Sequence, residues 1–239
     1  MRHLLDSKPK HWWHAHVRHL VIDVLRGGSS VNNAIRVLSK FTGIVDLVLL
    51  GNPGPALLPV LAGIPLTRLA TRSDFGQLLE EEYMRVNSPA MSSLTHITLL
   101  AGGVSHDFDF GAWAGRLGCF PSLTHVALYF PWYSVPTMGQ HDFFRKVLAG
   151  CAHLRVFIMI YTSGSSGLVG ELANCIQQLQ YLSDDTRFVL CEKDVDSMTN
   201  WVNGAEGGED YWSRAERFIE QRRSGEIQGS NFVLSSNKQ

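Results

Sequence analysis

The chain has 239 residues, of which 45% are hydrophobic and 18% are charged, a composition typical of a globular protein that buries a substantial core. The formal net charge is −1, which excludes an overall positive field that would attract nucleic acid or an anionic membrane surface. No run of apolar residues approaches the roughly 20 that a membrane span requires. We therefore expect neither nucleic acid nor a membrane among the partners.

The cysteines are spread along the chain without any C-x-x-C spacing. Such usage is more typical of a reduced intracellular protein than of a disulfide framework. The N-terminus is polar and rich in histidine and tryptophan, without the apolar stretch of a signal peptide. The sequence therefore predicts an intracellular protein, located in the cytoplasm or the nucleus.

A six-residue pattern, L-x-x-h-x-L with h apolar, recurs along the chain. Its clearest copies are LTHITL over Leu94–Leu99 and LTHVAL over Leu123–Leu128. This is the strand pattern of a leucine-rich repeat, in which each unit adds one strand to a growing sheet. The other copies begin at Val17, Ile44, Leu66, Leu154 and, in weaker form, Thr186.

The intervals between these strand segments contain apolar residues at helical spacing. Glycine follows several of these stripes, as is common at helix C-termini. The expected helices cover about 31–41, 55–62, 74–83, 110–117, 143–148 and 168–179. Strands and helices therefore alternate along the repeat region.

This alternation fits either a doubly wound α/β enzyme or a solenoid. In a doubly wound sheet helices cover both faces, so the strands are apolar throughout. Here Ile97 and Leu99 alternate with polar residues such as His96, although Val48 and Ile158 interrupt the alternation. The sequence therefore predicts an α/β leucine-rich-repeat-like solenoid, with one curved parallel sheet and the helices on its convex side.

The expected domain organisation has one domain and a tail. A helix over 209–223 carries Trp212 and Phe218 on one face, and we expect it to cover the open end of the repeat array. The stretches are a solenoid with an N-terminal cap over 1–196, a C-terminal capping region of the same domain over 197–224, and a polar, disordered tail over 225–239.

The third position of the repeated pattern points away from the helices, because side chains alternate between the two faces along a strand. Successive strands align these positions as a ladder on the concave face of the sheet. We expect this exposed face, and an aromatic loop beside it, to bind a protein partner. The candidate residues are His19, Asp46, Arg68, His96 and His125 on the sheet, and Trp132 and Tyr133 in the loop.

Motifs of catalysis are scarce in the sequence. It contains no G-x-S-x-G elbow, phosphate loop or G-x-G-x-x-G motif, and we expect no catalytic residue, metal or cofactor. His11 and His14 would share one face of a helix, an arrangement that suits zinc. The alternative, which we favour, is an N-terminal cap in which Trp12 and Trp13 cover the first repeat.

Several segments resemble the fungal F-box/leucine-rich-repeat-like proteins over roughly residues 11–227. Such proteins often carry an N-terminal F-box that docks on a ubiquitin-ligase adaptor, while their repeats recognise a target. No L-P-x-E-like F-box segment precedes Val17, which argues against the ligase adaptor as a partner. The resemblance rests on HVRHLVID, LTHITLL, FPSLTHVALY, CAHLRVFIM and DYWSRAERFIEQRRSGEI.

The leading hypothesis is a non-enzymatic module that recognises a protein through its concave sheet face or rim loops, derived from an F-box substrate receptor as the resemblance implies. An α/β enzyme with a non-standard active site and a purely structural scaffold are the alternatives. Strands that are apolar throughout would favour the enzyme, whereas alternation on one side favours the recognition module.

Overall fold

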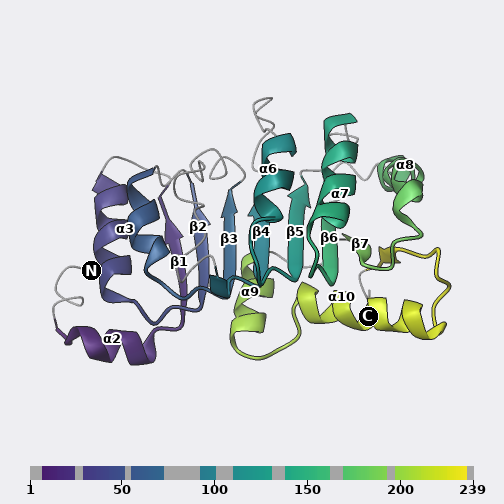
Figure 1. Ribbon diagram of the computed structural model, residues 1–239. Coiled ribbons are helices and arrows are strands. Elements are labelled where there is room, and N and C mark those ends of the chain that lie inside the picture. The colour runs from purple at the N-terminus through teal and green to yellow at the C-terminus, as the bar shows by residue number, and fades with distance from the viewer. Residues whose placement is uncertain are drawn as a thin grey trace.

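The computed structural model of the chain describes residues 7–24, 29–51, 55–72, 92–100, 110–130, 138–161, 169–192 and 197–235. Within these ranges, eight strands form a single parallel sheet whose spatial order follows the sequence (Figure 1). The expected α/β fold with one parallel sheet is therefore confirmed. The strands are β1 (His19–Asp23), β2 (Asp46–Leu50), β3 (Arg68–Arg72), β4 (His96–Leu100), β5 (His125–Phe130), β6 (Val156–Tyr161), β7 (Phe188–Glu192) and β8 (Val233–Leu234).

Each of the first six strands begins at the third position of a repeated pattern. The weak seventh copy, predicted to begin at Thr186, is out of register by one residue, because Phe188 pairs with Phe157, a residue at the fourth position. Ile97 of β4 pairs with Val126 of β5, and Leu99 pairs with Leu128. All four side chains are buried in one core. A slip by one residue would turn each of them to the opposite face, so the alternation of apolar residues specifies the register.

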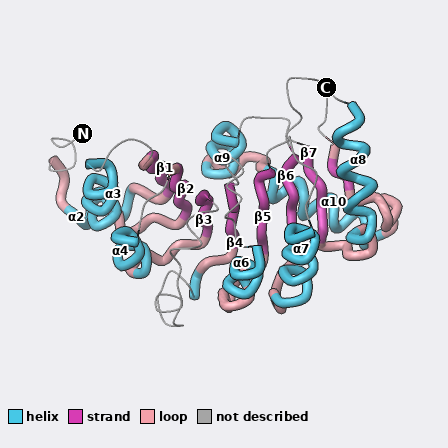
Figure 2. The backbone as a smooth tube through the Cα atoms, turned by 90° about the horizontal axis from the view of Figure 1, so that it is seen from above, coloured by secondary structure: helices cyan, strands magenta, loops and turns pink. Residues whose placement is uncertain are grey.

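One layer of helices follows the convex face of the sheet. Figure 2 shows the sheet as a shallow arc, with α4, α6 and α7 on its convex side. The main core lies between this layer and the sheet. The expected helix over 74–83 lies outside the described residues. The elements of this layer are α3 (Ser29–Lys40), the short η1 (Pro55–Leu57), α4 (Leu58–Ala62), α6 (Phe110–Leu117), α7 (Met138–Gly150), α8 (Val169–Leu179) and η3 (Gln180–Leu182).

A row of phenylalanine rings fills the C-terminal half of this core. Phe144, Phe157, Phe188 and Phe232 follow one another with ring centroids 5.7, 5.8 and 5.7 Å apart. Aromatic pairs at such spacing contribute roughly 0.5–1.5 kcal/mol each beyond the burial of their surface. The row joins α7, β6 and β7 to the segment that precedes β8.

The prediction of a disordered tail over 225–239 is wrong for 225–235. Phe232 is 2% exposed, and β8 pairs in parallel with β7. The buried Arg222 guanidinium donates hydrogen bonds to the carbonyl oxygens of Ser183 (2.6 Å), Phe188 (2.9 Å) and Gly229 (2.6 Å). The largely polar composition suggested disorder, but one phenylalanine and one guanidinium hold this segment in place.

Two further helices lie on the concave face, and Figure 2 shows the first of them there. They are α9 (Ser197–Ala205), which the sequence did not predict, and α10 (Tyr211–Ser224); together we call them the C-terminal arm. The prediction that the helices lie on the convex side alone is therefore wrong. So is the prediction that the C-terminal helix covers the open end of the array.

The arm has its own core on this face. Trp212, Phe218 and Ile219 of α10 pack with Ala127 and Ile158, whose side chains point away from the main core. The apolar stripe of the helix was predicted correctly, and small apolar residues on the sheet provide its partner. A capping box, in which the Asp210 carboxylate accepts from the Ser213 backbone N–H, begins the helix.

At the opposite end of the sheet, α2 (Lys10–His16) packs against α3. The Trp13 ring is buried, with its centroid 5.0 Å from that of Phe41. Gly43 permits this approach, because a Cβ atom there would overlap the His14 carbonyl oxygen. The N-terminal segment therefore packs on α3 and contributes Trp13 to the main core.

Candidate functional site

The structure brings the five candidate sheet residues together as a ladder of neighbours. His19 pairs with Asp46, Asp46 with Arg68, Arg68 with His96, and His96 with His125. The C-terminal arm lies over part of the ladder, so the ladder is only partly exposed. Trp132 and Tyr133 lie outside the described residues.

Burial differs along the ladder. Asp46 and His125 are each 3% exposed, so the prediction that they face solvent is wrong. His96 is half-buried, whereas the side chains of His19 and Arg68 keep 37% and 36% of their surface exposed. A polar side chain on a strand indicates solvent only when no other element covers it, and here a distant segment does.

His96 and His125 form a stacked pair beneath α10. Their ring centroids are 4.0 Å apart with an interplanar angle of 9°, and Trp212 meets both rings edge-on. The His125 Nε2 atom lies 3.1 Å from the Glu216 carboxylate, which also belongs to α10. The histidine pair therefore forms part of the surface on which α10 packs.

Electrostatics keep this pair neutral near pH 7. Burial lowers the pKa of His96 to about 2, and the positive charges of the neighbouring His125, Arg68 and Arg155 act in the same direction. Burial also lowers the pKa of His125, although the hydrogen bond and the charge of Glu216 oppose it. Protonation of His96 is therefore disfavoured in the folded protein, whereas for His125 the attraction to Glu216 offsets part of the cost of burying the charge.

Polar contacts attach the remainder of the arm to the ladder. The Trp201 indole Nε1–H of α9 donates to the Asp46 carboxylate (2.9 Å). The Arg68 guanidinium donates to the Asp210 carboxylate (3.0 Å), at the N-cap of α10. Burial raises the pKa of Asp46, an effect that the bond from Trp201 and the charges of Arg68 and His19 oppose.

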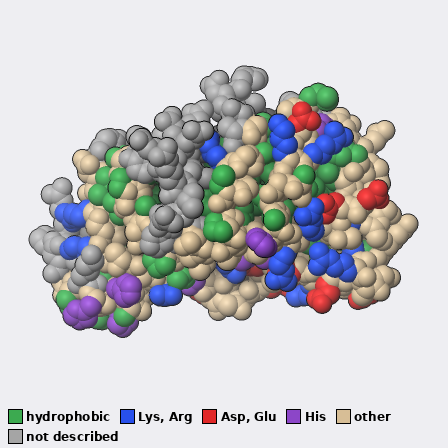
Figure 3. Space-filling model, in the orientation of Figure 1, with side chains coloured by type: hydrophobic (Ala, Val, Ile, Leu, Met, Phe, Trp, Pro, Cys, Tyr) green, Lys and Arg blue, Asp and Glu red, His purple; other side chains and the backbone are tan. Residues whose placement is uncertain are grey.

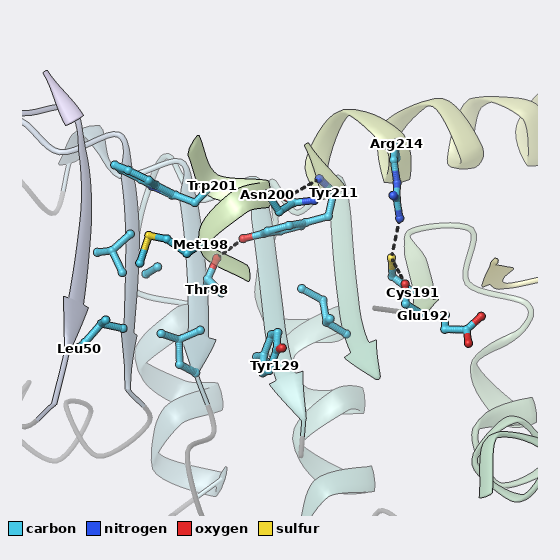
Figure 4. A pocket seen from close by; sticks show the side chains of 14 residues that line it. Leu50, Thr98, Tyr129, Cys191, Glu192, Met198, Asn200, Trp201, Tyr211 and Arg214 are labelled. Carbon is cyan, nitrogen blue, oxygen red and sulfur yellow. Dashed lines mark hydrogen bonds between the residues drawn. The ribbon is translucent and has the colours of Figure 1, made fainter. Parts of the chain in front are cut away.

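Beside the ladder, the sheet and the arm leave a cavity that opens to solvent. We call it the carboxyl-edge hollow, because it lies toward the carboxyl ends of the strands (Figure 4). Ligands of parallel α/β sheets commonly bind at this edge. The sheet side includes Val48, Leu50, Ala70, Thr98, Leu100 and Tyr129. The arm side consists of Met198, Asn200, Trp201, Tyr211 and Arg214.

The hollow is mainly apolar and contains a few polar groups. The Thr98 and Tyr211 hydroxyl groups share a hydrogen bond of 2.6 Å (Figure 4). The Asn200 side-chain oxygen accepts from the Tyr211 backbone N–H (3.0 Å), and the Arg214 guanidinium donates to the Cys191 Sγ atom (3.4 Å). Burial raises the pKa of Tyr211, so the hydroxyl group stays protonated near pH 7. Such a lining can hold an apolar group and offer it hydrogen bonds.

Sequence reasoning missed the arm side of this hollow. Met198 and Trp201 lie three residues apart in an apolar segment, which is the spacing of one helix face and the signal that α9 offered. On the sheet side, Val48, Ala70 and Thr98 belong to the fifth position of the repeated pattern, which was assigned to the concave face. The structure places them there.

The histidines of the N-terminal helix lie close together. Figure 3 shows histidines gathered over α2, which carries His11, His14 and His16. No group of three or more His, Cys, Asp or Glu side chains in the described part of the chain is arranged to hold a metal ion. Among the same residues, no helix combines the length and apolar character needed to cross a membrane.

Comparison with known proteins assigns the chain to no family. No known protein-family model matches the chain, and no curated protein matches it either.

Proposed function

We propose that this protein is a non-enzymatic recognition module that binds a protein partner at the carboxyl-edge hollow. The fold in this proposal is a leucine-rich-repeat-like solenoid whose concave face is partly closed by the C-terminal arm. The observation that carries the proposal is the open, mainly apolar cavity between Ala70 and Thr98 on the sheet and Trp201 and Tyr211 on the arm.

The physical support comes from the lining of the hollow. Apolar walls with a few placed polar groups are typical of binding sites. At protein interfaces, a buried aromatic or aliphatic anchor from one partner commonly fills such a pocket on the other and supplies most of the affinity. The hollow thus replaces the ladder as the expected contact of the concave face.

The resemblance to fungal F-box/leucine-rich-repeat-like proteins belongs to the same proposal. The repeats of such proteins recognise a target, and the hollow would be the part of the repeat surface that does so here. Recognition by this chain does not depend on whether a ligase adaptor is also bound.

An α/β enzyme remains the second candidate, because one observation favours it. All six residues of β6 are buried, so part of the sheet is covered on both faces as in doubly wound enzymes. The mass of a purified partner, measured before and after incubation with this protein, distinguishes the two functions. Recognition alone leaves the partner unchanged after incubation, whereas an enzyme would cleave or modify it in a manner that filling the hollow abolishes.

Affinity purification with quantitative mass spectrometry tests the main proposal. Ala70→Phe adds a ring inside the hollow without removing a buried side chain, and Ala152→Phe adds the same ring to an exposed turn that precedes β6. We expect Ala70→Phe to lose a partner that the wild type and Ala152→Phe both retain. A set of partners identical in all three samples would contradict a role for the hollow.

A further inference from the structure

Asn200 has an unused hydrogen-bonding capacity at the wall of the carboxyl-edge hollow. Its side chain is 7% exposed, and its oxygen accepts from the Tyr211 backbone N–H. Because that N–H is a donor, the amide oxygen must face it, and the Nδ2 atom faces elsewhere. Within the described ranges, Nδ2 donates to no other group. Nδ2 is not fully enclosed, and because Asn200 lines the hollow, an acceptor that occupies the hollow can take this hydrogen bond.

The neighbouring hydroxyl pair offers a second donor. Thr98 and Tyr211 each carry one O–H, and the 2.6 Å bond between them uses only one of the two. In the described part of the chain, the other O–H has no recipient. Thr98, Tyr211 and Asn200 all line the hollow, so two donors without an acceptor lie in the wall of the same apolar cavity.

The charges near the hollow favour a neutral acceptor over an ionised one. Glu192 and Arg214 both line the cavity at the β7 side, and their opposite charges give the lining no net sign. An ionised ligand would lose its hydration without gaining a net counter-charge, whereas a neutral carbonyl oxygen loses less. The chemistry that fits is an apolar body with a carbonyl group beside it.

Building on the proposed function, we propose that the occupant of the hollow carries a neutral carbonyl acceptor next to its apolar group, and that Asn200 Nδ2 and the Thr98–Tyr211 hydroxyl pair donate to it. In a protein partner this acceptor is a backbone carbonyl oxygen beside an aromatic or aliphatic side chain. A small ketone or amide supplies the same chemistry in a free ligand.

Ligand-observed fluorine NMR of the full chain tests the inference with three probes. They are para-fluorophenylacetone, para-fluoropropylbenzene, which has the same shape without a carbonyl group, and the methylamide of N-acetyl-para-fluorophenylalanine, which mimics a peptide. Asn200→Asp keeps the oxygen that accepts from Tyr211 N–H but removes the Nδ2 donors, and the double variant Thr98→Val, Tyr211→Phe removes both hydroxyl groups of the pair. Thermal melts of both variants check that the fold persists.

We expect each variant to weaken the ketone by about twofold to tenfold, the contribution of one hydrogen bond, while the hydrocarbon keeps its wild-type affinity. Equal effects on the ketone and the hydrocarbon, or no effect on either, overturn the assigned donors. Ala70→Phe should abolish the binding of both probes.

The peptide mimic separates this inference from the proposed function. If it responds to the variants as the ketone does, both stand. If it fails to bind while the ketone binds and responds, the carbonyl acceptor stands and a protein partner at the hollow does not. If no probe binds the wild type, or if Ala70→Phe leaves binding unchanged, the hollow is not a site and both proposals fall.

Discussion

Lowering the pH should destabilise this protein through His96. The ring lies under Trp212 in a stack with His125, and burial lowers its pKa to about 2, compared with 6.5 in the unfolded chain. The folded state therefore prefers the neutral ring, and the unfolded state binds a proton first as the pH falls. Stability from this group is complete above pH 6.5 and is lost progressively as the pH falls toward about 2.

The size of the effect follows from the two pKa values of His96. At pH 5 the unfolded ring is protonated about 1.5 pH units below its own pKa, whereas the folded ring is still neutral. Each unit corresponds to about 1.36 kcal/mol, so the loss between pH 7.5 and pH 5 is about 2 kcal/mol. The lowered pKa of His125 acts in the same direction.

Urea unfolding at pH 7.5 and at pH 5 measures this loss, with His96→Gln as the matched control. The histidines outside the stacked pair titrate in both proteins, so their contribution cancels in the comparison. We expect the wild type to lose about 2 kcal/mol more than His96→Gln over this interval. Equal losses of unfolding free energy in the two proteins would refute the idea that the His96 ring must stay neutral for α10 to pack on it.

Three further predictions concern the core and the cysteines. Ile97→Ala should reduce the free energy of unfolding by about 2–5 kcal/mol, because Ile97 is 2% exposed and its removal leaves a cavity; a loss below about 0.5 kcal/mol in urea unfolding would contradict the strand register. Phe232→Ala should cost about 3–5 kcal/mol, since the ring completes the phenylalanine row; an unchanged urea midpoint would show that the tail contributes nothing. Cys119 is exposed, whereas burial raises the pKa of Cys151 and of Cys175 to about 11. Iodoacetamide at pH 8 should therefore modify Cys119 first, as measured by mass spectrometry over time. Earlier modification of either buried thiol would contradict the packing.

The repeated pattern was enough to predict the parallel sheet, its strand order and the register of the first six strands, whereas the copy at Thr186 was placed one residue too late. Ile97 and Leu99 show why, because alternating apolar side chains specify a strand, its buried face and its alignment with the next copy. These are local properties, and each copy of the pattern reports them independently. The parallel order was expected because helical patterns separate the strand segments, and a helical connection can return the chain to the same edge of the sheet.

The covered concave face could not be predicted in the same way. His125 is polar and was assigned to solvent, but Glu216 and Trp212, about 90 residues later in the chain, close over it. Local periodicity does not report which distant segment packs on a face. A signal was nevertheless present, since Ile158 interrupts the polar alternation and the apolar stripe of α10 needed an apolar partner.

The hollow contains residues that the repeated pattern predicts and residues that it does not predict. Thr98 lies at a predicted position on the concave face, whereas Asn200 and Trp201 come from a helix that the repeated pattern does not extend to. The shape of a cavity between a sheet and an arm depends on how the two pack, and composition alone does not specify that packing. Such a site can be identified only when the position of the arm on the sheet is known.

Photo-crosslinking from the rim of the carboxyl-edge hollow tests the central claim most directly. Leu100 lines the hollow, and a benzophenone amino acid at position 100 would contact whatever occupies it, whereas the same group at position 152 lies on an exposed turn. The account predicts a covalent adduct with a protein partner from position 100, its loss when Ala70→Phe is added, and no such adduct from position 152. An adduct that survives Ala70→Phe, or that forms equally from position 152, would contradict recognition at the hollow.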